Sequence, residues 1–231
     1  MITLIKTGNV VPEIARQYGD FEAWFSAGLG VASLQQVDVF SNQPLPDLES
    51  INSIVITGSA AMVSHREEWS EKTARWLQRV VRAGLPVLGV CYGHQLLAHA
   101  LGGKVGPNPN GRQIGTVTAT MLDTARDDPL LGSLPLQFKT QVSHMESVLE
   151  LPPDAKRLAT SPLDENFVIR FSENAWGVQF HPEFSAAVIA KYIAYRSEVI
   201  RQEGLNPEQL LANVKETEQA NSLLQKFAEI F

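Results

Sequence analysis

Short apolar segments alternate with helical patterns through the first hundred residues, and this alternation restricts the possible folds more than any other feature. Strands are predicted at Ile2–Lys6, Val31–Phe40, Ser53–Thr57 and Pro86–Val90, and helices at Glu13–Ala27, Glu67–Ala83 and His94–Leu101. Strands that alternate with helices form βαβ units around a parallel sheet. From residue 102 to 177 the runs are shorter and alternate, as in Ile114–Met121, which predicts antiparallel strands. We therefore expect an α/β fold with a mixed sheet.

The chain contains a single cysteine, Cys91, which lies between the fourth predicted strand and the helix after it. Gly89 and Gly93 flank it at two residues' distance, and glycines permit a cramped strand-to-helix turn that lifts a side chain clear of a sheet. The N–H groups and dipole at the start of the helix favour the thiolate over the thiol. Cys91 is therefore a candidate nucleophile, with a buried structural cysteine as the alternative.

A second group of polar residues follows another short apolar segment, Trp176–Phe180. His181 and Glu183 are separated by Pro182, and residues two apart in an extended segment project to the same side. The proline restricts the backbone of both neighbours. This arrangement suits a base held by a carboxylate, and the alternative is a structural histidine next to a helix-capping glutamate.

Together these two segments resemble the signatures of the class I, triad-type glutamine amidotransferases. Residues 89–95 (Gly-Val-Cys-Tyr-Gly-His-Gln) resemble the nucleophile signature, and residues 177–183 (Gly-Val-Gln-Phe-His-Pro-Glu) resemble the His/Glu signature. The resemblance implies a flavodoxin-like open mixed sheet, mainly parallel, with helices on both faces. It also implies that Cys91, His181 and Glu183 form a catalytic triad that cleaves glutamine or a γ-glutamyl compound through a γ-glutamyl thioester. No metal or cofactor is implied.

Two looser matches extend the resemblance to the oxyanion hole and the substrate pocket. The turn at Gly58 and Ser59 matches the oxyanion segment, although Ser59 and Ala60 replace the usual second glycine and proline. Main-chain N–H groups of Ser59 and Tyr92 are the expected donors. Residues expected to contact the substrate are Gln95, Ser143, His144 and Met145.

Composition is consistent with a compact enzyme of one domain, residues 1–231. The formal charge of −6 and the lack of a basic stripe argue against nucleic-acid binding. No apolar run is long enough to span a bilayer, and a lone cysteine cannot form an intramolecular disulfide. We therefore expect a cytoplasmic protein with no membrane association.

The C-terminal residues, about 205–231, are expected to form a helical extension. Asn206, Pro207 and Gln209 form a helix-start pattern. An apolar stripe follows at Leu210, Leu211, Val214, Leu223, Leu224, Phe227 and Ile230. We expect this stripe to pack on its own domain; homodimerisation through it is the alternative.

Three functions remain open from the residues and the resemblance. The leading hypothesis is a stand-alone hydrolase of glutamine or a γ-glutamyl compound. A second is the glutaminase subunit of a two-chain GMP synthetase, which would require a synthetase partner because the chain shows no nucleotide-binding glycine motif. A third is a non-catalytic regulatory module that keeps the fold.

Overall fold

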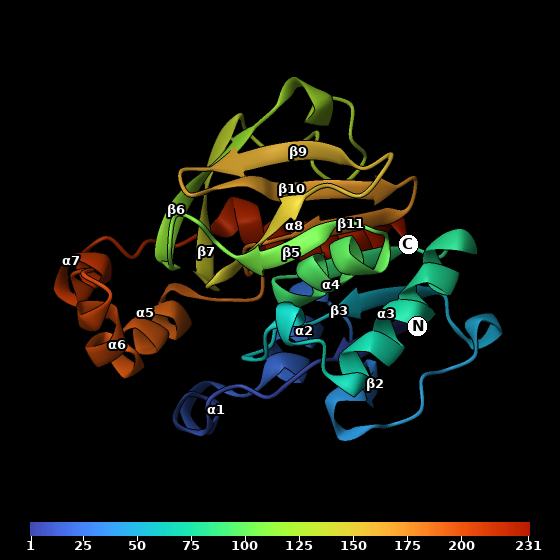
Figure 1. Cartoon of the computed structure of the whole chain (residues 1–231), viewed down its shortest axis with the longest axis horizontal. Coiled ribbons are helices and arrows are strands. Elements are labelled where there is room, and N and C mark those ends of the chain that lie inside the picture. The colour runs from blue at the N-terminus through green and yellow to red at the C-terminus, as the bar shows by residue number, and fades with distance from the viewer.

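A computed structural model describes residues 1–231 and contains a nine-stranded mixed sheet (Figure 1). Five neighbouring strands are parallel: β1 (Ile2–Lys6), β2 (Gln35–Asp38), β3 (Ser53–Ile56), β4 (Val87–Val90) and β11 (Ala175–Val178). Four antiparallel strands continue the sheet: β6 (Gln113–Met121), β7 (Gln137–His144), β9 (Lys156–Ser161) and β10 (Asp164–Ser172). The order across the sheet is β2-β1-β3-β4-β11-β10-β9-β6-β7. The predicted mixed α/β fold is confirmed.

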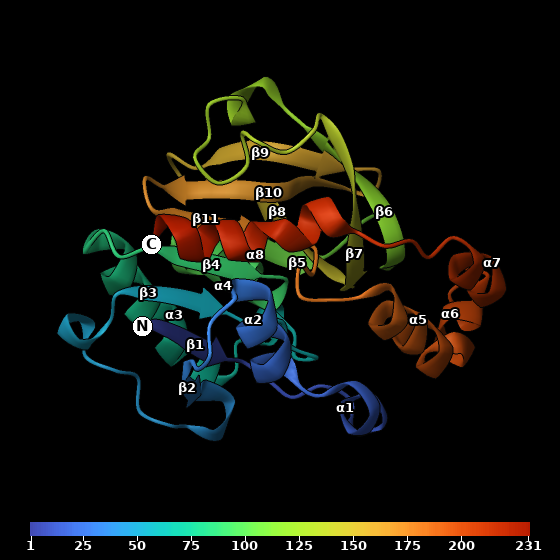
Figure 2. The same cartoon turned by 180° about the vertical axis from the view of Figure 1, so that it is seen from behind.

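Helices cover both faces of the sheet, as Figures 1 and 2 show from opposite sides. One face carries α3 (Glu68–Arg82) and α4 (Tyr92–Ala100), and the other carries α2 (Phe21–Leu29) and α8 (Glu218–Ile230). The remaining helices, grouped to one side, are α1 (Pro12–Tyr18), α5 (Ala186–Tyr195), α6 (Ser197–Gln202) and α7 (Pro207–Ala212). A separate two-stranded ladder pairs β5 (Lys104–Pro107) with β8 (Glu146–Glu150).

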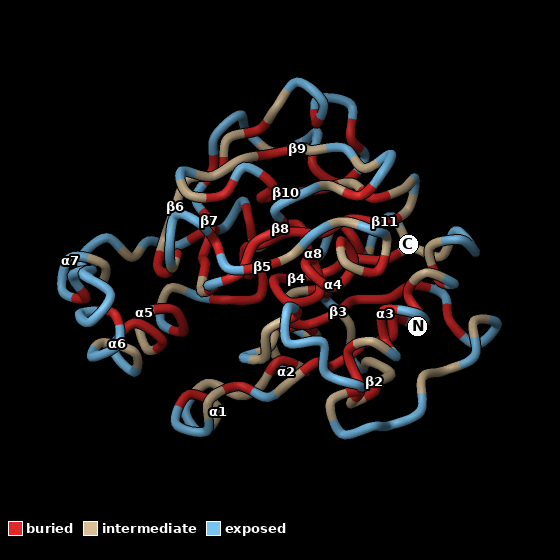
Figure 3. The backbone as a smooth tube through the Cα atoms, viewed as in Figure 1, coloured by how far each residue is buried: buried red, intermediate tan, exposed pale blue.

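The apolar core is divided by the sheet into two clusters. The larger contains 36 buried residues and includes the inner sides of α2 and α8, whereas the smaller contains 22 and includes those of α3 and α4. Figure 3 shows burial concentrated along the central strands and the helix sides that face them. None of the helices combines the length and the apolar character needed to cross a bilayer.

The helix predicted at Glu13–Ala27 is two helices, α1 and α2, and its prediction as one segment was wrong. The chain turns at Gly19, which has a φ of +87°, a value that favours glycine. Asp20 then caps α2, with its Oδ1 accepting a hydrogen bond from the Phe21 N–H at 2.7 Å. The helical stretch expected from Phe184 to about Gln202 begins later, at Ala186, and is interrupted at Arg196.

The C-terminal extension is also two helices rather than one. Asn206 caps α7 as predicted, and its Oδ1 accepts from the Gln209 N–H at 2.9 Å. The connection to α8 lies along the sheet, because the Lys215 N–H donates to the Thr116 Oγ1 at 3.0 Å. In α8 the apolar side chains of Leu223, Leu224 and Phe227 are buried in the larger cluster. The stripe of α8 is therefore packed within its own chain.

Candidate active site

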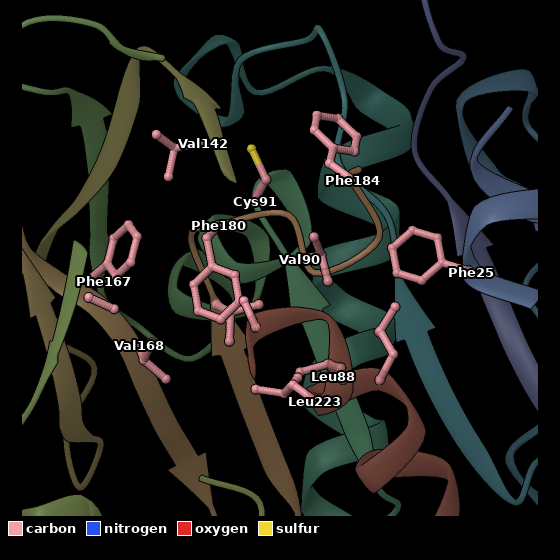
Figure 4. Packing of buried hydrophobic residues seen from close by; sticks show 14 of the residues in the cluster. Phe25, Leu88, Val90, Cys91, Val142, Phe167, Val168, Phe180, Phe184 and Leu223 are labelled. Carbon is pink, nitrogen blue, oxygen red and sulfur yellow. The ribbon is translucent and has the colours of Figure 1, made fainter. Parts of the chain in front are cut away.

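Cys91 occupies the turn between β4 and α4, with a φ of +50° and a ψ of −100°. A non-glycine residue seldom adopts a positive φ, so the nucleophile candidate is held in a strained conformation. The flanking glycines permit close backbone contact instead: a Cβ on Gly89 would lie 2.5 Å from the carbonyl oxygen of Gly93. Figure 4 shows Cys91 at the edge of the apolar packing, beyond Val90 and Leu88 of the same strand. The predicted strand-turn-helix is present.

Cys91 and His181 come together because their strands are adjacent and parallel. Val90 of β4 pairs with Val178 of β11, and the Cys91 N–H donates to the Val178 carbonyl oxygen at 2.8 Å. His181 follows three residues later, and its own N–H donates to the Gln141 carbonyl oxygen at 2.8 Å. Both side chains therefore lie beyond the carboxyl ends of neighbouring strands, where open α/β sheets bind ligands.

His181 and Glu183 form a buried hydrogen-bonded ion pair, with 2.7 Å between His181 Nδ1 and Glu183 Oε1. Burial alone would lower the pKa of His181, but the Glu183 carboxylate and then the Cys91 sulfur raise it, to about 10. At neutral pH the ring is therefore an imidazolium between a carboxylate and a sulfur. This is the nucleophile–base–orienter order that the sequence predicted.

The orientation of the His181 ring is also fixed by aromatic stacking, which the sequence did not predict. The ring lies on Phe184 with centroids 4.0 Å apart and an interplanar angle of 9°. Phe184 in turn stacks on Tyr192 of α5 at 5.2 Å and 14°. Stacking leaves the imidazole little freedom to rotate away from Cys91.

The C-terminal helix holds the loop that carries these residues. Asn221 of α8 donates from Nδ2 to the carbonyl oxygens of Pro182, at 2.6 Å, and Phe184, at 3.1 Å. These two carbonyls flank Glu183, so α8 fixes the backbone on both sides of the carboxylate. Asn221 lies outside every motif noted in the sequence.

The turn after β3 places Gly58 and Ser59 beside the triad. A Cβ on Gly58 would lie 2.8 Å from His181 Cε1, so only glycine fits without moving the ring. The Gly58 carbonyl oxygen accepts from Thr7 Oγ1 at 2.9 Å, and Ser59 Oγ donates to the Thr7 carbonyl oxygen at 2.8 Å. Thr7 therefore keeps the turn in shape although the usual second glycine and proline are absent.

The two predicted oxyanion donors are main-chain groups with no protein acceptor. Neither the Ser59 N–H nor the Tyr92 N–H makes a backbone hydrogen bond. The Tyr92 phenol points elsewhere and bonds Ser70 Oγ at 2.6 Å, and burial raises the pKa of this hydroxyl. Tyr92 can therefore serve the site only through its N–H, the type of donor that stabilises a developing oxyanion.

A pocket opens over Cys91 and brings the predicted substrate contacts together. It is lined by Ser59, Ala60, Ala61, Met62, Cys91, Gln95, Arg112, Ser143, His144, Met145, Glu146 and Arg196. Gln95 donates from Nε2 to the Glu146 carbonyl oxygen at 2.7 Å and to Gln179 Oε1 at 3.0 Å. Its two N–H groups are thus used by the protein, which leaves its amide oxygen for a ligand.

His144 has a supporting role in this pocket. Burial and the charges of His181 and Arg112 lower its pKa to about 4, against a raising hydrogen bond from the Glu146 main chain. The neutral ring lies 2.9 Å from that carbonyl oxygen through Nδ1, and 3.0 Å from the Gln113 side-chain amide through Nε2. The ring is therefore tied into the protein, and only the main chain of this segment is free for substrate.

Several residues of the site carried no signal in the sequence. Arg112, Glu146 and Arg196 line the pocket, and Tyr192 lines a second, adjoining cavity. They come from strands and helices far apart in the chain, so no local pattern could have joined them. No three His, Cys, Asp or Glu side chains are placed to hold a metal ion together.

The model of the class-I glutamine amidotransferase family matches residues 26–197 of the chain. The chain belongs to this family. The resemblance inferred from residues 89–95 and 177–183 is thereby confirmed.

Curated relatives of this amidotransferase include proteins with two kinds of name. A GMP synthase [glutamine-hydrolyzing] of Aeropyrum pernix is 35% identical over 182 residues, which cover 78% of this chain but 34% of that protein. Gamma-glutamyl peptidase 5 of Arabidopsis thaliana is 31% identical over 149 residues, covering 64% of this chain and 59% of the peptidase. The chain thus spans less than two thirds of either relative. One of the two-chain type, a GMP synthase [glutamine-hydrolyzing] subunit from Archaeoglobus fulgidus, is 27% identical over 167 residues, covering 72% and 85%.

Solved structures with the same fold include other amidotransferases. The crystal structure of a glutamine amidotransferase from Thermotoga maritima matches with a TM-score of 0.76 and 21% identity, covering 100% of this chain and 97% of the other. One from Methylobacillus flagellatus matches with a TM-score of 0.76 and 19% identity, covering 99% and 92%. At these identities the similarity supports the fold, and it spans the C-terminal helices as well as the motifs.

Proposed function

We propose that this amidotransferase hydrolyses the γ-carbonyl amide of glutamine or of a γ-glutamyl compound. The observation that carries the proposal is the imidazolium of His181, held by Glu183 at 2.7 Å and raised in pKa by the sulfur of Cys91. An ionised sulfur beside an imidazolium is both a nucleophile and a proton source. Acyl transfer from a γ-glutamyl amide requires both.

The reaction has two steps that share one oxyanion hole. The Cys91 sulfur attacks the γ-carbonyl carbon, the carbon–nitrogen bond breaks, and the leaving nitrogen takes the proton of His181. Water then attacks the γ-glutamyl thioester while His181 takes one of its protons, and the carbon–sulfur bond breaks to release glutamate. In both steps the N–H groups of Ser59 and Tyr92 stabilise the negative oxygen. Gln95 and the main chain of residues 143–145 hold the glutamyl group.

The names of the relatives support two versions of this activity. Those called γ-glutamyl peptidases favour a hydrolase that acts alone. The relatives named as single subunits of GMP synthase favour a glutaminase that serves a synthetase partner, and the chain matches most of their length. We place the stand-alone hydrolase first, because the proposed triad, oxyanion turn and pocket are complete within this chain.

Assays of the purified chain separate these versions. With glutamine and several γ-glutamyl peptides as substrates, we expect release of glutamate without any partner. Activity that is negligible alone and restored by a nucleotide-loaded synthetase partner would instead support the GMP synthetase version. If Cys91 is neither labelled by a thiol-reactive electrophile nor required for biological activity, the chain is a non-catalytic module.

Replacing Gly58 with alanine should lower kcat/KM about 10²-fold, because the new Cβ would lie 2.8 Å from His181 Cε1 and displace the ring. Gly106→Ala is a matched control, since its Cβ would meet only the end of the flexible Leu149 side chain, at 3.2 Å. Steady-state kinetics and thermal unfolding of both variants measure the difference. Equal kcat/KM for Gly58→Ala and wild type would show that this turn does not position the ring.

A further inference from the structure

Arg196 carries a guanidinium group with no partner in the protein. It lies between α5 and α6, and its Nε is buried with no hydrogen-bond partner. Burial and the charge of Arg112 lower its pKa. An uncompensated cation that is partly withdrawn from water destabilises a fold. The group therefore needs an anion that this chain does not supply.

The neighbouring charges around Arg196 are already paired. Arg112 donates to both carboxylate oxygens of Glu203, from Nε at 2.6 Å and from a terminal nitrogen at 2.9 Å. Glu203 acts on Arg196 only through space, as do the hydroxyls of Tyr192 and Tyr195. Arg196 is thus the cation at this place that is left free for a ligand.

Arg196 lies on the wall shared by two adjoining cavities. Both are lined by Ser59, Ala60, Ser143 and Arg196. The first cavity continues to Cys91, Gln95 and Glu146, whereas the second continues to His181. Since His181 gives its proton to the leaving nitrogen, the glutamyl group belongs in the first cavity and the leaving group in the second.

The second cavity suits an apolar group with a negative charge. Its other lining residues are Asn9, Val11, Phe21, Phe184 and Tyr192. Most of these side chains are apolar or aromatic, and the Tyr192 hydroxyl stays neutral because burial raises its pKa. Ammonia, the product from glutamine, has neither an apolar body nor a negative charge to occupy such a cavity.

We propose that Arg196 binds a carboxylate on the leaving group, so that the favoured substrate is a γ-glutamyl amino acid with an apolar side chain. This inference rests on the proposed hydrolysis and names its substrate class. The planar guanidinium binds a carboxylate through two parallel hydrogen bonds. Cleavage of the γ-amide bond with one water yields glutamate and a free apolar amino acid, whose amine carries the proton from His181.

The test compares γ-glutamyl-phenylalanine with γ-glutamyl-phenylalaninamide, which lacks only the carboxylate charge, and includes glutamine. Wild type should prefer the acid over the amide by about 10- to 100-fold in kcat/KM. In Arg196→Gln this ratio should fall towards one, and Arg196→Lys should keep part of it. Arg201→Gln is the matched control, because Arg201 is an exposed arginine of α6 that pairs with Glu208, and its ratio should equal that of wild type.

Three results would overturn the inference. Wild type could cleave the acid and the amide equally well. Arg196→Gln could lower kcat/KM for all three substrates together with the ratio unchanged, which would place the α-carboxylate of the glutamyl group on Arg196. Wild type could cleave glutamine but neither γ-glutamyl compound, in which case the proposed hydrolysis stands without this substrate class. Failure of all three substrates, with no labelling of Cys91, would reject the hydrolysis itself.

Discussion

Cys91→Ala should lower kcat/KM for glutamine and γ-glutamyl substrates by about 10⁴-fold or more, to near the uncatalysed rate. The variant keeps the backbone of the turn but removes the only thiol in the chain. Alanine at a φ of +50° is about as strained as cysteine, so the free energy of unfolding should change by only about 1 kcal/mol. Glutamate release and thermal unfolding measure the two effects.

Covalent labelling provides an independent reading of the same variant. A thiol-reactive electrophile should add once to the wild-type chain, at Cys91, and not to Cys91→Ala, as intact mass would show. Substrate should protect wild type from the label because both occupy the pocket over the sulfur. Hydrolysis that persists in Cys91→Ala would eliminate the thioester route.

Glu183→Gln should lower kcat/KM by about 10² to 10⁴-fold, because an amide no longer balances the imidazolium of His181. Burial lowers the pKa of His181, and the Glu183 charge is the largest influence that opposes it. Without that charge the pKa of the ring should fall from about 10. Glu150→Gln removes an exposed carboxylate that pairs only with Lys104, and serves as the control.

The sign of the pH dependence follows from the raised pKa of His181. Its pair with Glu183 stabilises the fold fully below the unfolded pKa of about 6.5, and this stabilisation is lost as the pH rises through about 10. In Glu183→Gln the alkaline loss of activity should therefore begin at lower pH, and unfolding should depend less on pH between about 7 and 10. Titration of the ring by NMR and pH–rate profiles measure both. An unchanged alkaline limb would show that Glu183 does not set the charge of His181.

The fold and the proposed triad could be predicted because their signals are local. Gly89, Cys91 and Gly93 lie within one turn, and His181 and Glu183 lie within another, and adjacent parallel strands bring the two turns together. The helix break at Gly19 and Asp20 was also visible as a glycine followed by a capping residue. It was missed because the apolar spacing on both sides fits one continuous helix.

The remaining parts of the site depend on contacts between distant segments. Arg196 belongs to a stretch that reads as ordinary helix, and its significance appears only when the cavities on either side of it are known. Thr7 and Gly58 are separated by 51 residues yet share a buried hydrogen bond. Such contacts follow from the packing of the whole chain, which no spacing rule reports.

The anchoring of the His181 loop by Asn221 also bears on how small a working version of this protein can be. The family match ends at residue 197, whereas the side chain that grips both ends of the Glu183 backbone lies 24 residues further on. An excised fragment that retained every recognisable motif would therefore still lose its grip on the proposed general acid. The boundary of sequence similarity and the boundary of the catalytic unit do not coincide in this chain.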